Sequence, residues 1–323
     1  YATSCSSGTA AINIAIKALE LKEGDEVIMP SFTIISCAQF LITSGIKPVL
    51  IDCDYKTFNM KVSDIETKIT SKTKAIMIVH IFGLTVDVDP AINIAKKHNL
   101  KIIEDSAEMF GQEYKRNKCG TFGDISIFSF YSNKHITTGE GGMLLTDDKH
   151  LDKRSKSLRN LCFTSDRFVH NELGYNYRMT NIQAAIGVAQ LEKIELIKKK
   201  KRWIGKKYNE MLKNFKNINL PIIKTDYCEN IYWVYPITLK DNYPKTAKQV
   251  MDELKELKIG TRPFFYPMHK QPIFNKMGLF LDDILPNSEK LYQRGLYVPS
   301  GLALTDNQIE QVSLALGKVL NET

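Results

Sequence analysis

The amino-acid sequence predicts an α/β protein. We expect a large domain on a mixed, mostly parallel sheet between helices, followed by a smaller C-terminal α/β domain. Through the first 150 residues, short apolar runs alternate with helical patterns, which is typical of βαβ units whose sheet is covered on both faces. From Thr180 onward, one long helical stretch replaces this alternation, and we interpret it as a connector. The expected domains are residues 1–200 and 201–323.

The elements of the first hundred residues follow from apolar spacing and from turn residues. Ala11, Ile14, Ala15 and Ala18 recur at helical spacing, so a helix begins at the Ser-Gly-Thr sequence over 7–9. The apolar runs between helices are short and rich in β-branched residues, as in buried strands. The expected order is a helix over 8–20, a strand over 26–29 stopped by Pro30, a helix over 33–44, strands over 48–51 and 75–80, a helix over 88–98 and a strand over 101–105.

The remaining elements are fewer and more widely spaced. A β-type run over 125–131 leads through Lys134 to the pair Gly141 and Gly142, and a second strand follows over 143–146. The connector helix begins at Asn181 and continues through Tyr208 and beyond. The smaller domain is expected to contain a strand over 232–235, a helix over 246–258 and a final helix over 306–320.

Composition is ordinary for a globular protein, with 43% hydrophobic and 25% charged residues. No apolar run approaches the length of a membrane span, and no signal-peptide pattern is visible at the N-terminus. The six cysteines are scattered, with no CxxC pair and no nearby histidine cluster. This pattern argues against a zinc site or a disulfide framework, so we expect no metal, no membrane association and a cytoplasmic location.

The net charge of +8 raises the question of nucleic-acid binding. The densest basic run, Lys198 to Arg202, lies on the connector helix among Glu192, Glu195 and Glu210. We interpret this run as a solvated helix face and expect no nucleic-acid partner. A mild positive balance also suits an anionic, phosphorylated small molecule.

Three features together match what pyridoxal phosphate requires of a protein: an amine, a carboxylate for its ring nitrogen, and donors for its phosphate. Lys134 follows a strand and precedes a glycine-rich turn, where a partly desolvated lysine is a usable nucleophile. Asp105 ends a buried strand, where ligands of α/β sheets gather. The helix start over 7–9 offers free N–H groups and hydroxyls to a phosphate, and Ser129 offers another hydroxyl.

Each feature alone has an ordinary structural explanation. Most lysines are solvated surface charges, a Ser-Gly-Thr helix start is often a plain N-cap, and Asp105 could be a loop acid. A nucleotide-binding loop is disfavoured, because there is no GxxxxGK[ST] sequence and the glycines over 139–142 lead into a strand and not a helix. The combination of the three, in order and with matching roles, favours the cofactor site.

The sequence resembles the DegT/DnrJ/EryC1/StrS family of sugar aminotransferases, which are fold-type I pyridoxal-phosphate enzymes. The resemblance extends from Tyr1 to the last helix. It rests on Ser-Ser-Gly-Thr-Ala-Ala at 6–11, on the segments 24–33 and 73–80, on Ile-Glu-Asp-Ser-Ala-Glu at 103–108, on the Lys134 segment, and on the segment 174–187, which begins Gly-Tyr-Asn-Tyr-Arg.

This resemblance implies a role for each matching residue. Lys134 would form the Schiff base with pyridoxal 5'-phosphate and then shuttle protons. Asp105 would hold the pyridinium nitrogen, and Glu108 stands where relatives carry a residue near the hydroxyl edge of the cofactor. The phosphate would be bound by the following residues of the large domain: Ser7, Gly8, Thr9 and Ser129.

Further implied roles concern the partner subunit and the substrate. Asn176 would reach the phosphate of the neighbouring subunit's cofactor, which makes a homodimer with shared active sites the functional unit. Arg178 would lie on the substrate side. His269, in the segment 262–269 that borders the sugar nucleotide in relatives, is a further candidate for substrate binding.

The segment Ser-Asn-Lys-His-Ile-Thr-Thr-Gly-Glu-Gly-Gly over 132–142 is closer to enzymes that aminate C-4 of the sugar, GDP-perosamine synthases above all, than to those acting at C-3. The implied reaction moves an amino group from L-glutamate to a nucleotide-linked 4-keto-6-deoxyhexose, through pyridoxamine 5'-phosphate as intermediate. Two alternatives stay open. One is a 4-aminotransferase for UDP- or dTDP-4-keto-6-deoxyglucose, and the other is a non-catalytic regulator or binding protein with this fold.

Two departures from the family pattern bear on activity. Relatives have a leading segment ahead of the phosphate-binding helix, whereas this chain starts at Tyr1, so we expect its activity to be affected. Many relatives also place an aromatic residue where this chain has Ile34. An aliphatic side chain covers the cofactor ring without the aromatic stacking contribution, so we expect lower cofactor affinity.

Overall fold

The computed structural model describes residues 1–166 and 168–321. Its centre is a seven-stranded sheet with the order β1-β9-β8-β5-β4-β2-β3. Four neighbouring pairs are parallel, and only the pairs β1–β9 and β8–β9 are antiparallel. The strands are β1 (Ala2–Cys5), β2 (Glu26–Pro30), β3 (Lys47–Ile51), β4 (Thr73–Val79), β5 (Lys101–Asp105), β8 (Ile125–Ser129) and β9 (Gly142–Leu145). The predicted mixed, mostly parallel sheet is confirmed.

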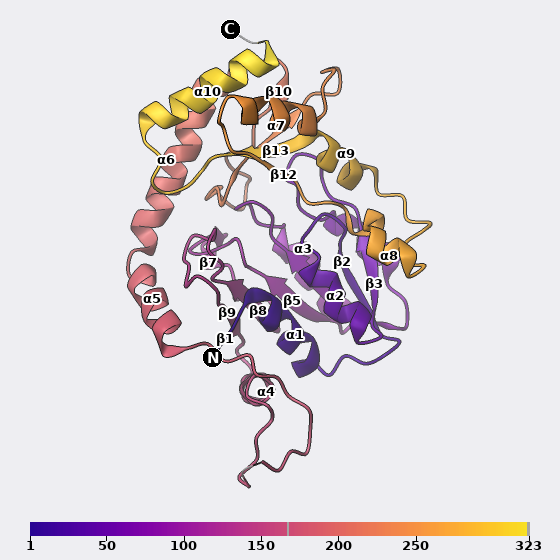
Figure 1. Cartoon of the computed structure of the whole chain (residues 1–323). Helices are drawn as coiled ribbons and strands as arrows, with labels where there is room; N and C mark the ends of the chain where they lie inside the picture. The colour runs from indigo at the N-terminus through magenta and orange to yellow at the C-terminus, as the bar shows by residue number, and fades with distance from the viewer. Residues whose placement is uncertain (167, 322–323) are drawn as a thin grey trace.

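Helices cover this sheet because its strands are apolar on both faces. The strands β2 and β8 are buried at every position, as expected for a sheet with crossover helices. α1 and α2 lie across the sheet in Figure 1. The helices of this part are α1 (Gly8–Ala18), α2 (Ser36–Thr43), α3 (Val88–Lys97) and α4 (Lys149–Leu158), with a small hairpin of β6 (Glu113–Tyr114) and β7 (Asn117–Lys118).

Two helices connect the large sheet to a second sheet (Figure 1). The connector that the sequence predicted as one helix is divided at Glu192 and Lys193 into α5 (Asn181–Leu191) and α6 (Ile194–Leu212). The second sheet has the order β10-β11-β13-β12. Its elements are β10 (Ile218–Asn219), β11 (Tyr235–Leu239), α7 (Ala247–Glu256), β12 (Arg262–Pro263), α8 (Pro272–Lys276), α9 (Pro286–Arg294), β13 (Gly295–Val298) and α10 (Asp306–Leu320).

The two largest apolar clusters of the described residues correspond to the two sheets. One lies around the large sheet, and the other runs from Ile204 on α6 to Leu320 at the end of α10. The large core also takes in residues from the C-terminal part, among them Trp233 and Phe264. The domain boundary predicted after residue 200 lies within α6, so this helix belongs to both predicted domains. The boundary stays a prediction.

The basic run on the connector helix is only partly the solvated face that the sequence suggested, because Lys199 is exposed whereas two other lysines are not. Lys198 and Lys201 are buried, at 8% and 5% exposure. The Lys201 ammonium donates to the carbonyl oxygens of Trp233 and Ser300, each at 2.7 Å, and burial lowers the pKa of Lys201 to about 8. Lys201 therefore ties α6 to the loops of the second sheet, a contact between distant segments that helical periodicity does not reveal.

Within the described residues, the helices are too short or too polar to cross a lipid bilayer.

Candidate active site

A cavity of about 420 Å³ opens at the carboxyl ends of β4, β5 and β8, beside the N-terminus of α1. Ligand sites of open α/β sheets form at such strand ends, and the volume lies in the usual range for a small cofactor. Seven residues predicted for the cofactor site line this one cavity: Ser7, Gly8, Thr9, Asp105, Glu108, Ser129 and Lys134.

Lys134 lies in the turn that follows β8, and its side chain is 12% exposed. The Nζ atom is 3.6 Å from Oε1 of Glu108 and 4.0 Å from the ring centroid of Trp233. The indole N–H of Trp233 donates to the carbonyl oxygen of Asn133 at 2.9 Å, which fixes the turn beside the lysine. A residue of the C-terminal part thus holds the amine in place through both its ring face and its N–H group.

Asp105 ends β5 and points into the cavity at 3% exposure. Its Oδ1 accepts a hydrogen bond from the Ala107 N–H at 3.0 Å, and its Oδ2 accepts one from the Cys37 thiol at 3.3 Å. Burial raises the pKa of Asp105, while the Ala107 N–H and the Lys134 charge oppose that effect. A cation beside this carboxylate, such as a protonated ring nitrogen, would offset the cost of burying its charge.

Glu108 faces Lys134 from the turn after β5. Its Oε2 accepts a hydrogen bond from the Phe82 N–H at 2.6 Å. Burial raises the pKa of Glu108 to about 7, despite the opposing influence of the Lys134 charge. A carboxyl group with such a pKa can hold or give up a proton near neutral pH.

The start of α1 forms a cradle against β8. Ser7 is the N-cap, and its Oγ accepts a hydrogen bond from the Ala10 N–H at 3.0 Å. The N–H groups of Gly8 and Thr9 have no acceptor within the helix, because they belong to its first turn. A Cβ atom on Gly8 would lie 2.7 Å from Cβ of Ser129, so only glycine allows this close approach. The free N–H groups and the Ser129 hydroxyl therefore converge where a phosphate fits.

The other predicted residues lie apart from this cavity. Asn176 and Arg178 are exposed, and Arg178 donates to the side-chain oxygen of Asn160 at 2.8 Å. His269 is 1% exposed, with Nδ1 2.8 Å from the Ser31 hydroxyl and Nε2 3.0 Å from Oε1 of Glu289. Both ring nitrogens of His269 therefore have protein partners, and its contact with substrate stays a prediction.

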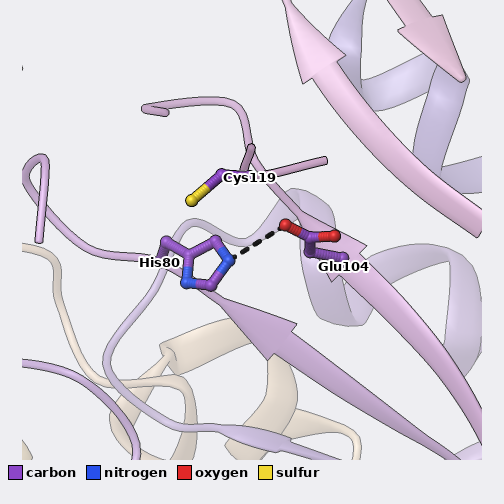
Figure 2. Close-up of side chains that lie close together, drawn as sticks. All are labelled: His80, Glu104 and Cys119. Carbon is purple, nitrogen blue, oxygen red and sulfur yellow. Dashed lines mark hydrogen bonds and ion pairs between the residues drawn. The ribbon is translucent and has the colours of Figure 1, made fainter. Parts of the chain in front are cut away.

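A group of possible metal ligands is formed by His80, which also lines the cavity, together with Glu104 and Cys119 (Figure 2). Nδ1 of His80 accepts the Val86 N–H at 3.0 Å, so Nε2 carries the proton and donates to Glu104 at 3.2 Å. Both carboxylate oxygens of Glu104 also accept hydrogen bonds from backbone N–H groups and serine hydroxyls.

These bonds leave the group unsuited to a metal ion. Burial would raise the pKa of Glu104, but the hydrogen bond from His80 and those from the loop outweigh it and lower the pKa to about 2. The carboxylate is a buried anion whose oxygens already have donors, and a metal would have to displace them. We interpret the group as a structural support for the carboxyl ends of β4 and β5.

The sequence analysis did not assign Trp233 and Cys37 to the site, nor several other residues that line the cavity, such as Tyr297. Trp233 was assigned only to a strand, and Cys37 only to a helix and to the count of free thiols. The aromatic residues of the C-terminal part do not predict that Trp233 contacts Lys134. The contact of Cys37 with Asp105 could not be predicted either, because 68 residues separate the two.

An amine, a buried carboxylate and a phosphate cradle around one cavity, at the carboxyl ends of a mixed α/β sheet, define the class of pyridoxal-phosphate-dependent transferases. The chain belongs to the DegT/DnrJ/EryC1/StrS aminotransferase family, whose model matches residues 1–317. The cofactor of this family is pyridoxal 5'-phosphate, and the residues around the cavity fit it.

Individual relatives are similar over nearly the whole chain. A GDP-perosamine synthase of Escherichia coli O157:H7 is 41% identical over 96% of this chain and 83% of its own length. A GDP-perosamine synthase of Caulobacter vibrioides is 39% identical over 99% of this chain and 86% of its own. Helicobacter pylori PseC, an aminotransferase involved in the biosynthesis of pseudoaminic acid, superposes with a TM-score of 0.93 at 25% identity, covering 99% of this chain and 87% of that one.

Proposed function

We propose that this protein transfers an amino group from L-glutamate to C-4 of a nucleotide-linked 4-keto-6-deoxyhexose, as a GDP-perosamine synthase does. The observation that carries this proposal is the convergence of Lys134, Asp105 and the α1 cradle on one cavity. Family membership and 41% identity to a GDP-perosamine synthase support the sugar-nucleotide substrate.

The cofactor would be held at three points of the cavity. Ser7, Gly8, Thr9 and Ser129 would bind the phosphate through N–H and hydroxyl groups at the positive end of α1. Asp105 would pair with the ring nitrogen, and Glu108 would lie at the hydroxyl edge of the ring. Bound pyridoxal phosphate supplies an electron sink for the carbon that loses or gains a proton.

Lys134 would carry out the proton transfers. Its Nζ is held between the Glu108 carboxylate, at 3.6 Å, and the face of Trp233, so the amine is confined at the cavity. In its neutral form Nζ can take the proton from the α-carbon of glutamate, and in its protonated form it can deliver one to C-4 of the sugar. Positioned proton transfer of this kind contributes roughly 10²–10⁴-fold in rate.

A homodimer is the functional unit in this proposal. None of the residues of α5 is buried, although the helix carries the exposed apolar residues Ile182, Ile186, Val188 and Leu191. An apolar helix face of this kind is suited to a partner surface. The exposed residues Asn176 and Arg178 precede α5, so the same contact would carry Asn176 to the partner's cofactor phosphate and Arg178 to its substrate.

We also propose a cytoplasmic location. All six cysteines are free thiols and buried in the structure. Free thiols are usual in reducing compartments.

The test is an assay of the purified protein with pyridoxal phosphate and glutamate. GDP-4-keto-6-deoxymannose is compared with UDP- and dTDP-4-keto-6-deoxyglucose, and the amino-sugar product is assigned by NMR. We expect amination at C-4 with the GDP sugar preferred. Preference for a UDP or dTDP sugar would change the substrate assignment, and exclusive amination at C-3 would contradict the proposal.

Lys134→Ala provides the matching test of the catalytic residue. We expect the loss of borohydride-trapped cofactor and a fall in transamination of at least roughly 10²-fold. Lys74→Ala, at an exposed position of β4, is the control and should behave as the wild type. Trapping on another lysine would contradict the role of Lys134, and the absence of trapped cofactor in the wild type would favour the non-catalytic alternative.

A further inference from the structure

The Asp105 carboxylate has an unusual partner. Cys37 is the second residue of α2, is fully buried, and its Sγ lies 3.3 Å from Oδ2 of Asp105. Among the described residues, the only other hydrogen bond to this carboxylate comes from the Ala107 N–H on Oδ1. Each oxygen therefore has one donor, and the two donors lie on different elements, so together they fix the plane of the carboxylate.

The direction of this hydrogen bond is set by charge. Burial raises the pKa of Cys37 well above its ordinary value, and the neighbouring Asp105 charge adds to that effect. Cys37 is therefore a thiol at neutral pH and donates, while the carboxylate accepts. A hydrogen bond to an ionised group is stronger than one between neutral groups, even for a weak S–H donor.

The neighbours of Cys37 and Asp105 explain why the thiol directs its hydrogen to the Asp105 carboxylate. The Thr33 hydroxyl lies 3.6 Å from Sγ on the other side and can act as donor to the sulfur. The charged or titratable groups that face Asp105 are Lys134, which lies across the cavity, Glu108 and His80. None of them replaces the thiol as a hydrogen-bond donor to Oδ2 in the structure.

We propose that Cys37 is a positioning residue, which holds the Asp105 carboxylate in the orientation that meets the ring nitrogen of pyridoxal phosphate. The inference rests on the proposed function, because it assigns Cys37 a part in the same site. Loss of the thiol would let the carboxylate rotate about its terminal torsion, which is broad for aspartate. The carboxylate would then pair less well with the ring nitrogen, and the ring would be a weaker electron sink.

The first experiment uses the protein without cofactor. Asp105 is titrated by ¹³C NMR of the labelled carboxyl group in wild type, Cys37→Ser and Cys37→Ala. We expect a higher Asp105 pKa in Cys37→Ala, because a donor to the charged form is lost, and a value in Cys37→Ser at or below that of the wild type. The S–H stretching band of Cys37 should also shift to higher frequency in Asp105→Asn. An unchanged Asp105 pKa in Cys37→Ala would overturn the inference.

The second experiment reads the cofactor directly. The ¹⁵N signal of the ring nitrogen of bound, labelled pyridoxal phosphate should move toward the unprotonated pyridine in Cys37→Ala and stay near the wild-type position in Cys37→Ser. The rate of the half-reaction with glutamate should fall about tenfold in Cys37→Ala, as expected for one charge-assisted hydrogen bond, and should recover in Cys37→Ser.

Cys53→Ala is the matched control, because Cys53 is also a buried thiol near a carboxylate, Asp52, but lies outside the cavity. It should leave the ¹⁵N signal and the half-reaction unchanged. A ring signal that stays at the wild-type position in a folded Cys37→Ala would contradict the positioning role. Failure of the wild type itself to bind the cofactor or react with glutamate would contradict the proposed function instead, so the two failures are distinguishable.

Discussion

Glu108 is buried and its pKa is raised, which has a consequence for stability. The pKa of its carboxyl group rises from 4.5 to about 7 in the folded protein. Between those values the folded state keeps a proton that the unfolded state has released, so stability falls as pH rises through this window. The free-energy cost of burying the ionised Glu108 carboxylate is fully present above this pH window and absent below it.

Glu108→Gln should remove this dependence. Without cofactor, we expect the variant to lose less stability than the wild type between about pH 4.5 and 7, and to gain on the order of 1–3 kcal/mol relative to it at higher pH. Lys134 would then lose its nearby carboxylate, which reduces the gain. Urea unfolding at a series of pH values measures the effect, with the exposed Glu310→Gln as control. Identical pH profiles for wild type and Glu108→Gln would contradict the burial argument.

Gly8 lies at the start of α1, where the helix backbone approaches β8 closely. A methyl group there would lie 2.7 Å from Cβ of Ser129, which forces α1 and β8 apart. We expect Gly8→Ala to cost about 1–3 kcal/mol of stability and to weaken binding of pyridoxal phosphate at least about tenfold, because the phosphate cradle widens. Fluorescence titration with the cofactor measures the affinity. Gly260→Ala, whose added methyl meets no atom within 4 Å, is the control.

At the scale of elements, local sequence pattern predicted most of the large domain. The strand over 101–105 and the helix over 306–320 have the predicted bounds. The strand predicted over 232–235 begins only at Tyr235, because Tyr232 adopts a left-handed backbone conformation and Trp233 turns toward Lys134. That shift depends on a contact with a distant segment, which residue propensity does not include.

The division of the connector into α5 and α6 likewise has no signal in the sequence. Glu192 and Lys193 are good helix formers, with neither glycine nor proline nearby to break the helix. The side chain of Gln190 accepts a hydrogen bond from the Thr137 N–H at 2.9 Å, which holds the end of α5 against the turn that follows Lys134. The break between α5 and α6 therefore goes with packing against this turn and not with the helix propensity of the residues.

The exposed apolar face of α5 leads to a prediction about assembly. Ile186→Glu would place a charge in the proposed dimer contact, where it would be buried without a partner. We expect dimerisation to weaken at least about a hundredfold and transamination to fall with it. Analytical ultracentrifugation measures the association. Leu314→Glu, at an exposed leucine of α10, is the control and should remain dimeric. A dimeric Ile186→Glu protein would place the contact elsewhere.

At the scale of the whole molecule, the site combines residues that only the tertiary fold brings together. Asp105, Lys134 and the α1 start could be predicted because each lies at a recognisable strand or helix end. Trp233 and Cys37 could not, since their roles depend on contacts across 99 and 68 residues of sequence. For His269, a motif position predicted substrate binding, and the hydrogen bonds of both ring nitrogens to protein groups could not be predicted from the sequence, because Ser31 lies far from it along the chain.

Shared active sites predict that two inactive variants can restore each other. Lys134→Ala lacks the amine, and Asn176→Ala lacks the side chain proposed to reach the partner's cofactor phosphate. In a mixed dimer, one active site combines Lys134 of one subunit with Asn176 of the other. One of the two sites of that dimer is therefore intact. Random mixing of equal amounts through dissociated subunits should therefore restore about a quarter of the wild-type sites. Glutamate half-transamination in single turnover counts the active sites. Recovery should be absent when either variant is mixed with itself, and no recovery in the mixture would contradict the shared site.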